Sequence, residues 1–276
     1  MKVSIKGVRG SIPTTGSETM YFGGNTSCVT VVEDNWILVL DGGSGMQNVT
    51  IPENTKRVDI LLTHLHLDHI QGLGFFRPLF NPELDVNIWA PASATQTLHS
   101  RLSRYLSPPL FPVLIRDLPC NLKLHDISNS SFEIGPFKID SRYIIHPGPT
   151  VGFRIKGKTG VMAYLPDHEP ALGPTGLVHD KKWISGFDLF DEVDLLLHDA
   201  QYTAEEYKNR LGWGHSSMED TIDLAIMAKV KRLLLFHHDP GHNDVWMNEH
   251  YAVLLGKYGT QLSFDIAREG MEIELE

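Results

Sequence analysis

The sequence predicts an α+β fold in which two β-sheets pack face to face and helices cover both outer faces, a four-layer αββα sandwich. Short apolar runs typical of buried strands alternate with segments typical of helices. Several of these runs end in a histidine or an aspartate, which is expected when a fold gathers polar groups at one edge of its sheets. No internal repeat, low-complexity tract or long linker divides the 276 residues, so we expect one domain over residues 1–276.

The first half of the chain is predicted to hold five strands and one helix. Asp34 and Asn35 are turn residues, which favours an antiparallel pair on either side of them. The loop 10–24 contains Gly23 and Gly24, which allow a close backbone approach to a ligand, so we expect this loop to lie over a site. The predicted strands are 2–8, 27–33, 36–40, 58–62 and 85–90, and the predicted helix is 92–105, with Arg101 and Arg104 on its solvated face.

The second half is predicted to continue the same alternation. Residues 170–191 are rich in proline, glycine and polar residues and are expected to form a loop or a short helix. Ser217, with Asp220 three residues later, is a typical helix start. The predicted strands are 122–124, 131–134, 137–143, 151–155, 160–165, 194–197, 231–236 and 271–275, and the predicted helices are 203–211, 217–229 and 243–258.

The composition limits the partners that we expect. The formal net charge is −10, and proteins that bind polyanions usually carry a basic face, so DNA is excluded and RNA is disfavoured as a partner. Cys28 and Cys120 match no zinc-finger or disulfide spacing, which suits a reducing compartment. Because no apolar run has the length of a signal peptide or a membrane span, we expect a soluble, cytoplasmic protein with no membrane partner. The oligomeric state stays open.

The densest group of ionisable residues is the pattern His-x-His-x-Asp-His over residues 64–69. On an extended segment His64 and His66 point to one side and the intervening leucines point into the core. A turn brings Asp68 and His69 round to a second point nearby. Four unpaired polar side chains at a core edge would be costly, whereas imidazole and carboxylate groups are common metal ligands. The segment therefore predicts one loop that serves two neighbouring metal ions.

Other predicted strands also end in ionisable residues. His146, held between prolines and glycine, is a credible third ligand for the first metal. Asp41 follows a strand directly, where it either orients a metal-bound histidine or serves as an ordinary turn residue. The remaining such strand ends are Asp167, His198 and His237.

With these motifs, nearly the whole chain resembles the metallo-β-lactamase superfamily, which has an αββα sandwich and a dinuclear metal site. The resemblance implies that three histidines hold the first metal and that Asp68 and His69 bind the second. Asp167 would bridge both metals, and Asp68 also counts as catalytic. His237 would complete the second site because it follows its strand most directly, with His238 as the alternative. The implied first-site ligands are His64, His66 and His146.

Within the superfamily the chain looks most like the phosphodiesterase branch, which includes ribonuclease Z and the phosphoribosyl cyclic phosphate phosphodiesterases. Leu197-His198-Asp199-Ala200-Gln201 is similar to the His-Glu-Ala-Thr segment of ribonuclease Z, with Asp in place of Glu, and Gly214-His215-Ser216 is similar to its Gly-His-Ser-Thr segment. By this resemblance Asp199 would orient His215, which would protonate the leaving oxygen. The alternative is that Asp199 is only a strand end and His215 a neighbour of a helix cap.

Two departures weigh against RNA processing. The glycine-rich arm that ribonuclease Z uses for the tRNA elbow lies between the third histidine and the bridging aspartate, and here only a hairpin fits between His146 and Asp167. The acidic net charge also disfavours the binding of RNA. Ribonuclease Z-like activity is therefore kept as an alternative only.

The predicted function is metal-dependent hydrolysis of a small phosphodiester, cyclic ones included, or of a nucleotide, by a hydroxide that bridges two divalent cations. Imidazole-rich sites favour zinc first, and the carboxylates also suit manganese. The partner would be a small phosphorylated substrate. The alternative chemistry is hydrolysis of a lactone, thioester or lactam at the same dinuclear site, which would not need a dedicated acid such as His215. A third possibility is a non-catalytic protein, in which the metals are structural and the loop around residues 23–24 binds a ligand or a partner. It requires metal sites that have no open coordination position.

Overall fold

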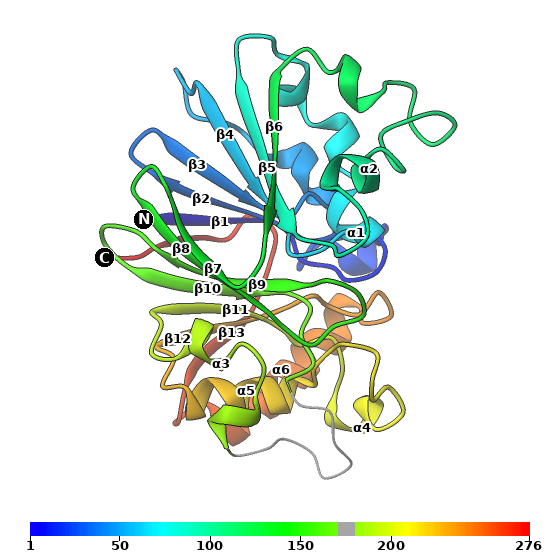
Figure 1. Ribbon diagram of the computed structural model, residues 1–276. Helices are drawn as coiled ribbons and strands as arrows, with labels where there is room; N and C mark the ends of the chain where they lie inside the picture. Colours follow the sequence, from blue (N-terminus) through cyan, green and yellow to red (C-terminus); the bar gives the residue numbers. More distant parts are fainter. Residues whose placement is uncertain (171–179) are drawn as a thin grey trace.

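Two seven-stranded sheets face each other across the centre of the computed structural model, which describes residues 1–170 and 180–276 (Figure 1). The neighbouring strands of the first sheet, in order across it, are β14 (Glu272–Glu274), β1 (Lys2–Gly7), β2 (Cys28–Glu33), β3 (Trp36–Leu40), β4 (Arg57–Leu61), β5 (Asp85–Pro91) and β6 (Asn121–Ile127). Those of the second are β13 (Ser263–Ile266), β12 (Arg232–Phe236), β11 (Leu195–Asp199), β10 (Val161–Leu165), β9 (Val151–Lys156), β8 (Phe137–Tyr143) and β7 (Ser130–Ile134).

The two sheets have the same plan of strand directions. In each, the strands that come first along the chain pair antiparallel, as β1–β2–β3 and β7–β8–β9–β10 do. The strands that come next pair parallel, as β3–β4–β5–β6 and β10–β11–β12–β13 do, and the last strand, β14, pairs antiparallel with β1. Parallel strands bring their carboxyl ends to one edge. This edge therefore gathers the segments that follow β3, β4, β10, β11 and β12. Strand β8 ends at the same edge, because β9 pairs antiparallel with both β8 and β10, so that β8 and β10 run in the same direction.

Helices cover the outer face of each sheet (Figure 1). The face of the first sheet carries α1 and α2, and that of the second carries α3 to α6. The bounds are α1 (Leu67–Ile70), α2 (Leu98–Leu102), α3 (Phe187–Phe190), α4 (Ala204–Tyr207), α5 (Met218–Met227) and α6 (Asp244–Tyr258). Short 3-10 helices lie at Ser17–Thr19, Ser44–Asn48, Leu73–Phe75, Arg77–Phe80, Ile115–Asp117 and Lys181–Trp183.

Three apolar cores follow from this layering. The alternation of side chains along each strand sends one set inward, where Val31, Leu38, Phe153 and Leu234 pack between the two sheets. The opposite sets pack under α2 on the first sheet and under α5 and α6 on the second. The predicted α+β sandwich is confirmed. Among the described residues, no helix has the length and apolar composition that crossing a membrane requires.

Some predicted elements differ from the structure. The helix predicted over 92–105 is α only at Leu98–Leu102, because the Ala92 amide still bonds to Ile127 and continues the sheet, and Thr97 then caps the helix through Ser100 N. The edge strand β13 was missed, since it has four residues and one exposed face. Of the predicted loop or short helix at 170–191, residues 171–179 lie outside the described residues, and the rest contains α3.

Candidate dinuclear metal centre

The segment after β4 changes direction within a few residues, which brings its side chains to two nearby points. His66 is extended and precedes α1, so Asp68 and His69 lie in the first turn of that helix. His64, Asp68 and His69 are buried. The prediction of one loop facing two neighbouring points agrees with this geometry. The prediction that both leucines point into the core is wrong for Leu67, which is 61% exposed because the helix starts there.

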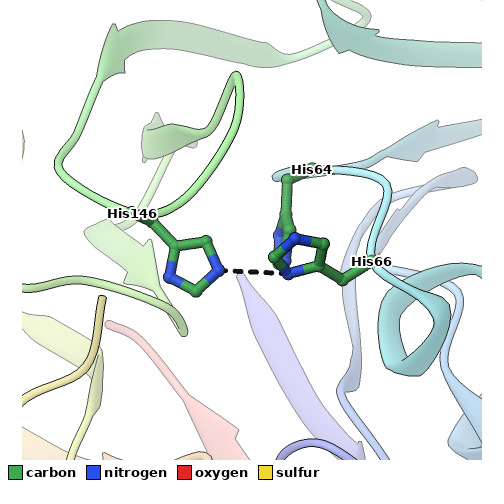
Figure 2. Close-up of side chains that lie close together, drawn as sticks. All are labelled: His64, His66 and His146. Atoms are coloured by element: carbon green, nitrogen blue, oxygen red, sulfur yellow. Dashed lines mark hydrogen bonds between the residues drawn. The ribbon is translucent and has the colours of Figure 1, made fainter. Parts of the chain in front are cut away.

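The first group consists of three imidazoles from two loops. Figure 2 shows His64 and His66 on the segment after β4, with His146 approaching from the loop after β8. The ring atoms His146 Nε2 and His66 Nδ1 are 3.1 Å apart, and one nitrogen from each of the three rings lies within 4.8 Å of the others. Three donor atoms around one point are a typical cation site.

Hydrogen bonds at the far side of these rings fix which nitrogen faces the centre. His146 Nδ1 donates to the carbonyl of Gly214 at 2.8 Å, so its Nε2 carries the free lone pair. The Oγ1 of Thr63 lies 3.1 Å from His64 Nδ1. Burial, together with the neighbouring His69, keeps the pKa of His64 well below 6.5. A buried neutral imidazole is the form that binds a metal.

The second group contains Asp68, His69 and His237. His69 Nε2 and His237 Nε2 each lie 3.4 Å from Asp68 Oδ2. Burial opposes a charge on His69, but Asp167, Asp68 and Asp41 outweigh it and raise its pKa well above 6.5. In the absence of a cation, the carboxylates therefore hold a proton on this ring. A metal ion that binds here must displace that proton.

Asp167, which follows β10, lies between the two groups. Its Oδ1 is 3.3 Å from His237 Nε2, 3.7 Å from His146 Nε2 and 3.8 Å from His64 Nε2. Its Oδ2 is 3.0 Å from His69 Nε2. Despite burial, the neighbouring histidines hold its pKa well below 3.8, so it is a carboxylate. One oxygen faces both groups and the other faces only the second.

The donor atoms at the centre fit metal ions because protein groups leave them unsatisfied. Buried polar atoms are almost always hydrogen-bonded. Here His64 Nε2, His69 Nε2, His237 Nε2 and Asp167 Oδ2 are buried and have no hydrogen-bond partner among the described residues. The three nitrogens lie 3.0–3.8 Å from the carboxylate oxygens of Asp167, so the four donor atoms surround a common region of the site. Divalent cations would satisfy them together.

The structure separates the two adjacent histidines after β12. His237 adopts φ 62°, a left-handed conformation that is uncommon for a non-glycine residue, and its ring turns into the site. The ring packs so closely on Gly10 that a Cβ there would lie 2.4 Å from it. His238 points the other way, and its Nε2 donates to the Ala267 carbonyl at 2.8 Å. The geometry thus brings His237 to the site and leaves His238 out.

His215 and Asp199 form a close pair beside the two groups. His215 Nδ1 lies 2.6 Å from Asp199 Oδ2, and its ring stacks on His237 with centroids 5.0 Å apart. Burial works against a charge, but Asp199, followed by Asp167 and Asp68, raises the pKa of His215 to about 9. The second oxygen of Asp199 accepts from the amides of Gln201 and Ser216. The predicted orienting contact is present, and the other ring nitrogen of His215 is free for chemistry.

Two buried carboxylates hold the site in place. Asp41, left open as a turn residue or a partner for a histidine, accepts from His69 Nδ1 at 2.8 Å, from the Thr63 amide at 2.7 Å and from the Tyr164 hydroxyl at 3.0 Å. The sequence reasoning missed Glu169. Its carboxylate accepts from the Tyr207 hydroxyl and from the amides of Gly212 and Gly214, each at 2.7–2.8 Å. Only its nearness in sequence to Asp167 hinted at a role.

Glu169 therefore fixes the loop that carries two parts of the site. Gly214 donates its amide to Glu169 and offers its carbonyl to His146. His215 is the next residue. A Cβ on Gly214, which has φ 91°, would lie 2.3–2.4 Å from Pro147 and from the His146 ring. The sequence shows a glycine before His215 but not this close approach.

Two polar side chains near the site, those of Arg9 and Asn25, hold loops together. Arg9 is fully buried, and its guanidinium donates to the carbonyls of Gly23, Asp239 and His242 at 2.7–3.1 Å. It ties the loop after β1 to the loop after β12. Asn25 bonds to Glu269 through both its amide and its side chain. Neither side chain is free for a substrate.

The chain is similar to proteins of related fold. It is 27% identical to a ribonuclease Z from Thermococcus sibiricus over 91% of this chain and 93% of the relative. It matches zinc-bound PqqB from Methylobacterium extorquens with a TM-score of 0.71 and 19% identity, over 100% of both chains. A diphosphatase of the PhnP family matches with a TM-score of 0.70 and 18% identity, over 100% of this chain and 98% of that one. The two structural matches support the fold.

The ribonuclease Z relative overturns one prediction. RNA was disfavoured as a partner because the chain is acidic and lacks an arm at the expected place. A relative that matches over nearly its whole length bears the name of a ribonuclease, so RNA was disfavoured wrongly. Net charge averages over the whole surface and does not describe the charge at the site, so it is a poor guide to this partner.

The family model described as the beta-lactamase superfamily domain matches residues 35–238. This range contains β3 to β12 and every residue of the two donor groups. The predicted resemblance is confirmed: the chain belongs to the beta-lactamase superfamily.

Proposed function

We propose that this metal-dependent hydrolase cleaves a phosphodiester, and that two divalent cations bind where the donor groups converge. His64, His66 and His146 would hold the first cation. Asp68, His69 and His237 would hold the second, and Asp167 would contact both. The unsatisfied buried donor atoms support this assignment. The imidazole-rich donor set favours zinc, with manganese second.

When bound, the cations would activate a water molecule and neutralise the phosphoryl oxygens. The chain's own residues do the rest. Asp41 and Gly214 fix the tautomers of His69 and His146. The buried Asp199 keeps His215 protonated on Nδ1, so the far nitrogen of the ring can give a proton to the departing oxygen.

The single observation that carries the phosphodiester assignment is the His215–Asp199 pair beside the metal donors, with the pKa of His215 raised to about 9. An alkoxide leaving from phosphorus needs a proton, and an imidazolium at neutral pH supplies one. A lactam or thioester hydrolase would not require this pair. We propose a small phosphodiester or nucleotide as substrate. RNA is the second candidate, favoured by the ribonuclease Z relative.

Hydrolysis of bis(p-nitrophenyl) phosphate by zinc- and manganese-loaded protein tests the proposal. A chromogenic lactam, a thioester and a short single-stranded RNA run alongside. His64→Ala should abolish turnover, whereas His99→Ala, which removes an exposed histidine outside the donor groups, should not. Activity on the lactam or thioester alone would overturn the proposal, and cleavage of RNA with weak turnover of small diesters would favour the second candidate.

A further inference from the structure

Two adjoining cavities lead from the candidate metal centre toward α2. The first has a volume of about 260 Å³ and is lined by His64, His66 and the turn Pro147–Pro149. The second, about 350 Å³, lies further along. Leu65, Gln96 and Arg101 line both cavities, so the two form one groove. Its size lies in the range of roughly 300–1,000 Å³ that small-ligand sites occupy.

The walls of this groove change character along its length. Next to the metal donors they carry the polar side chains of Ser93, Thr95 and Gln96. Further out, Leu67 and Leu110, which are 61% and 68% exposed, line the cavity together with Tyr105. Exposed apolar groups beside a site favour contact with a ligand over contact with water. This outer part suits a flat ring, and the inner part suits hydroxyl groups.

The outer part also carries positive charge in a chain of net charge −10. Arg101, predicted on a solvated face, is only 13% exposed, and its Nη2 donates to the Pro91 carbonyl and to Asp126 at 2.7 and 3.0 Å. Asp126 therefore offsets its charge. Arg104 is exposed, and no hydrogen bond or ion pair within residues 1–170 and 180–276 engages its guanidinium. Arg104 is thus a free cation at the far end of the groove.

The position of the groove relative to His215 decides which part of a diester it can receive. His215 lines neither cavity; its ring stacks on His237 and meets His146 edge-on, with ring centroids 5.0 and 5.1 Å apart, and its Nδ1 faces Asp199. The departing oxygen must lie near His215 to take its proton. The groove, on the side of His64 and His66, therefore faces the group that stays on the phosphorus.

Building on the proposed function, we propose that the groove binds the retained nucleoside of the substrate and that Arg104 binds a second phosphate on it. The substrate class is then a nucleotide that carries a phosphate beyond the scissile one. An ester of a mononucleoside bisphosphate and the end of an oligonucleotide share this chemistry.

A matched pair of chromogenic diesters tests the inference. The p-nitrophenyl ester of thymidine 5′-phosphate and the same ester with an added 3′-phosphate both release p-nitrophenol, and they differ only in the second phosphate. The metal-loaded wild type should have a KM roughly 1.5- to 5-fold lower for the 3′-phosphorylated ester, as for an exposed ion pair. Arg104→Ala should abolish this preference by raising the KM for the 3′-phosphorylated ester to that for the plain ester. Arg116→Ala removes another exposed arginine, one that lies outside the groove, and should keep the preference.

Equal KM values for the two esters in the wild type, or an equal loss on both in Arg104→Ala, would refute the groove assignment while leaving phosphodiester hydrolysis intact. Failure to hydrolyse either ester would instead refute the proposed function. A trinucleotide ester distinguishes the two sources of the phosphate. If the KM for the trinucleotide ester is lower than that for the 3′-phosphorylated ester, the substrate is an oligonucleotide. If the two KM values are equal, the substrate is a mononucleotide derivative.

Discussion

The contact between His215 and Asp199 is the part of the site whose loss should change the reaction most selectively. The two groups are 2.6 Å apart, Asp199 is fully buried and the His215 side chain is 12% exposed. Asp199→Asn keeps the size of the side chain and removes its charge. His215→Ala removes the proton donor itself. Neither residue is among the proposed metal ligands, so metal content should not change.

The size of the effect follows from the proton affinity of His215. Its pKa of about 9, against an ordinary 6.5, corresponds to about 3 kcal/mol in favour of the imidazolium. At pH 7 about 99% of His215 is then protonated. Without Asp199, only Asp167 and Asp68 oppose the effect of burial, so the pKa of His215 falls and less of it is protonated at pH 7. Turnover that depends on this proton is lost as pH rises through the pKa, so Asp199→Asn should move the descending limb of the pH profile to lower pH.

Two leaving groups separate this role from a structural one. p-Nitrophenolate is a stable anion and leaves without a proton, whereas the alkoxide from a 2′,3′-cyclic nucleotide needs one. We expect His215→Ala to lower kcat for the cyclic nucleotide about 10²–10⁴-fold, as for a lost general acid, and to change kcat for bis(p-nitrophenyl) phosphate only a few-fold. The kcat of Asp199→Asn for the cyclic nucleotide should lie between those of the wild type and His215→Ala.

Asp194→Asn is the matched control, because Asp194 lies just before β11 and contacts Lys231 rather than the site. Equal losses for both leaving groups, or a loss of metal in proportion to activity, would refute the assignment of His215 as the acid.

Three further predictions follow from the supporting contacts. Asp41→Asn should weaken the second metal about 10–100-fold, measured by chelator competition, because His69 loses the carboxylate that orients it. Zinc affinity, followed by calorimetry, should rise between pH 6 and 8, since the raised pKa of His69 means that a proton competes with the metal; a flat profile would argue against His69 as a ligand. Glu169→Gln should lower kcat more than zinc affinity, because the loop before His215 loses an anionic acceptor, and unchanged kinetics would show that the loop holds its position without it.

The parts of the site that the sequence predicted are those that rest on local spacing or on strand ends. The pattern at 64–69 is contained in one loop, and His146 and Asp167 follow strands that end at the same edge. The choice between His237 and His238 depended on the backbone turning to φ 62° at one residue, which spacing does not reveal. Leu67 was misplaced for a similar reason, because a four-residue helix replaced the expected extended chain.

What the sequence could not predict are contacts between distant segments. Glu169 bonds to residues 38 to 45 positions later, and nothing local marks it as a partner for them. The groove likewise exists only because the loop at 147–149 and α2 approach the segment after β4. The RNA prediction failed because composition describes the whole chain and not the site.

The number of metal ions needed for activity is the most direct test of the proposed dinuclear site. Metal bound to the wild type is measured by mass spectrometry while diester hydrolysis is followed as zinc is added. We expect two ions per chain and full activity only when the second is bound, with both lost in Asp167→Ala because that carboxylate lies between the two groups. Full activity with one ion or none, or two ions retained by Asp167→Ala, would show that the site is not dinuclear as proposed.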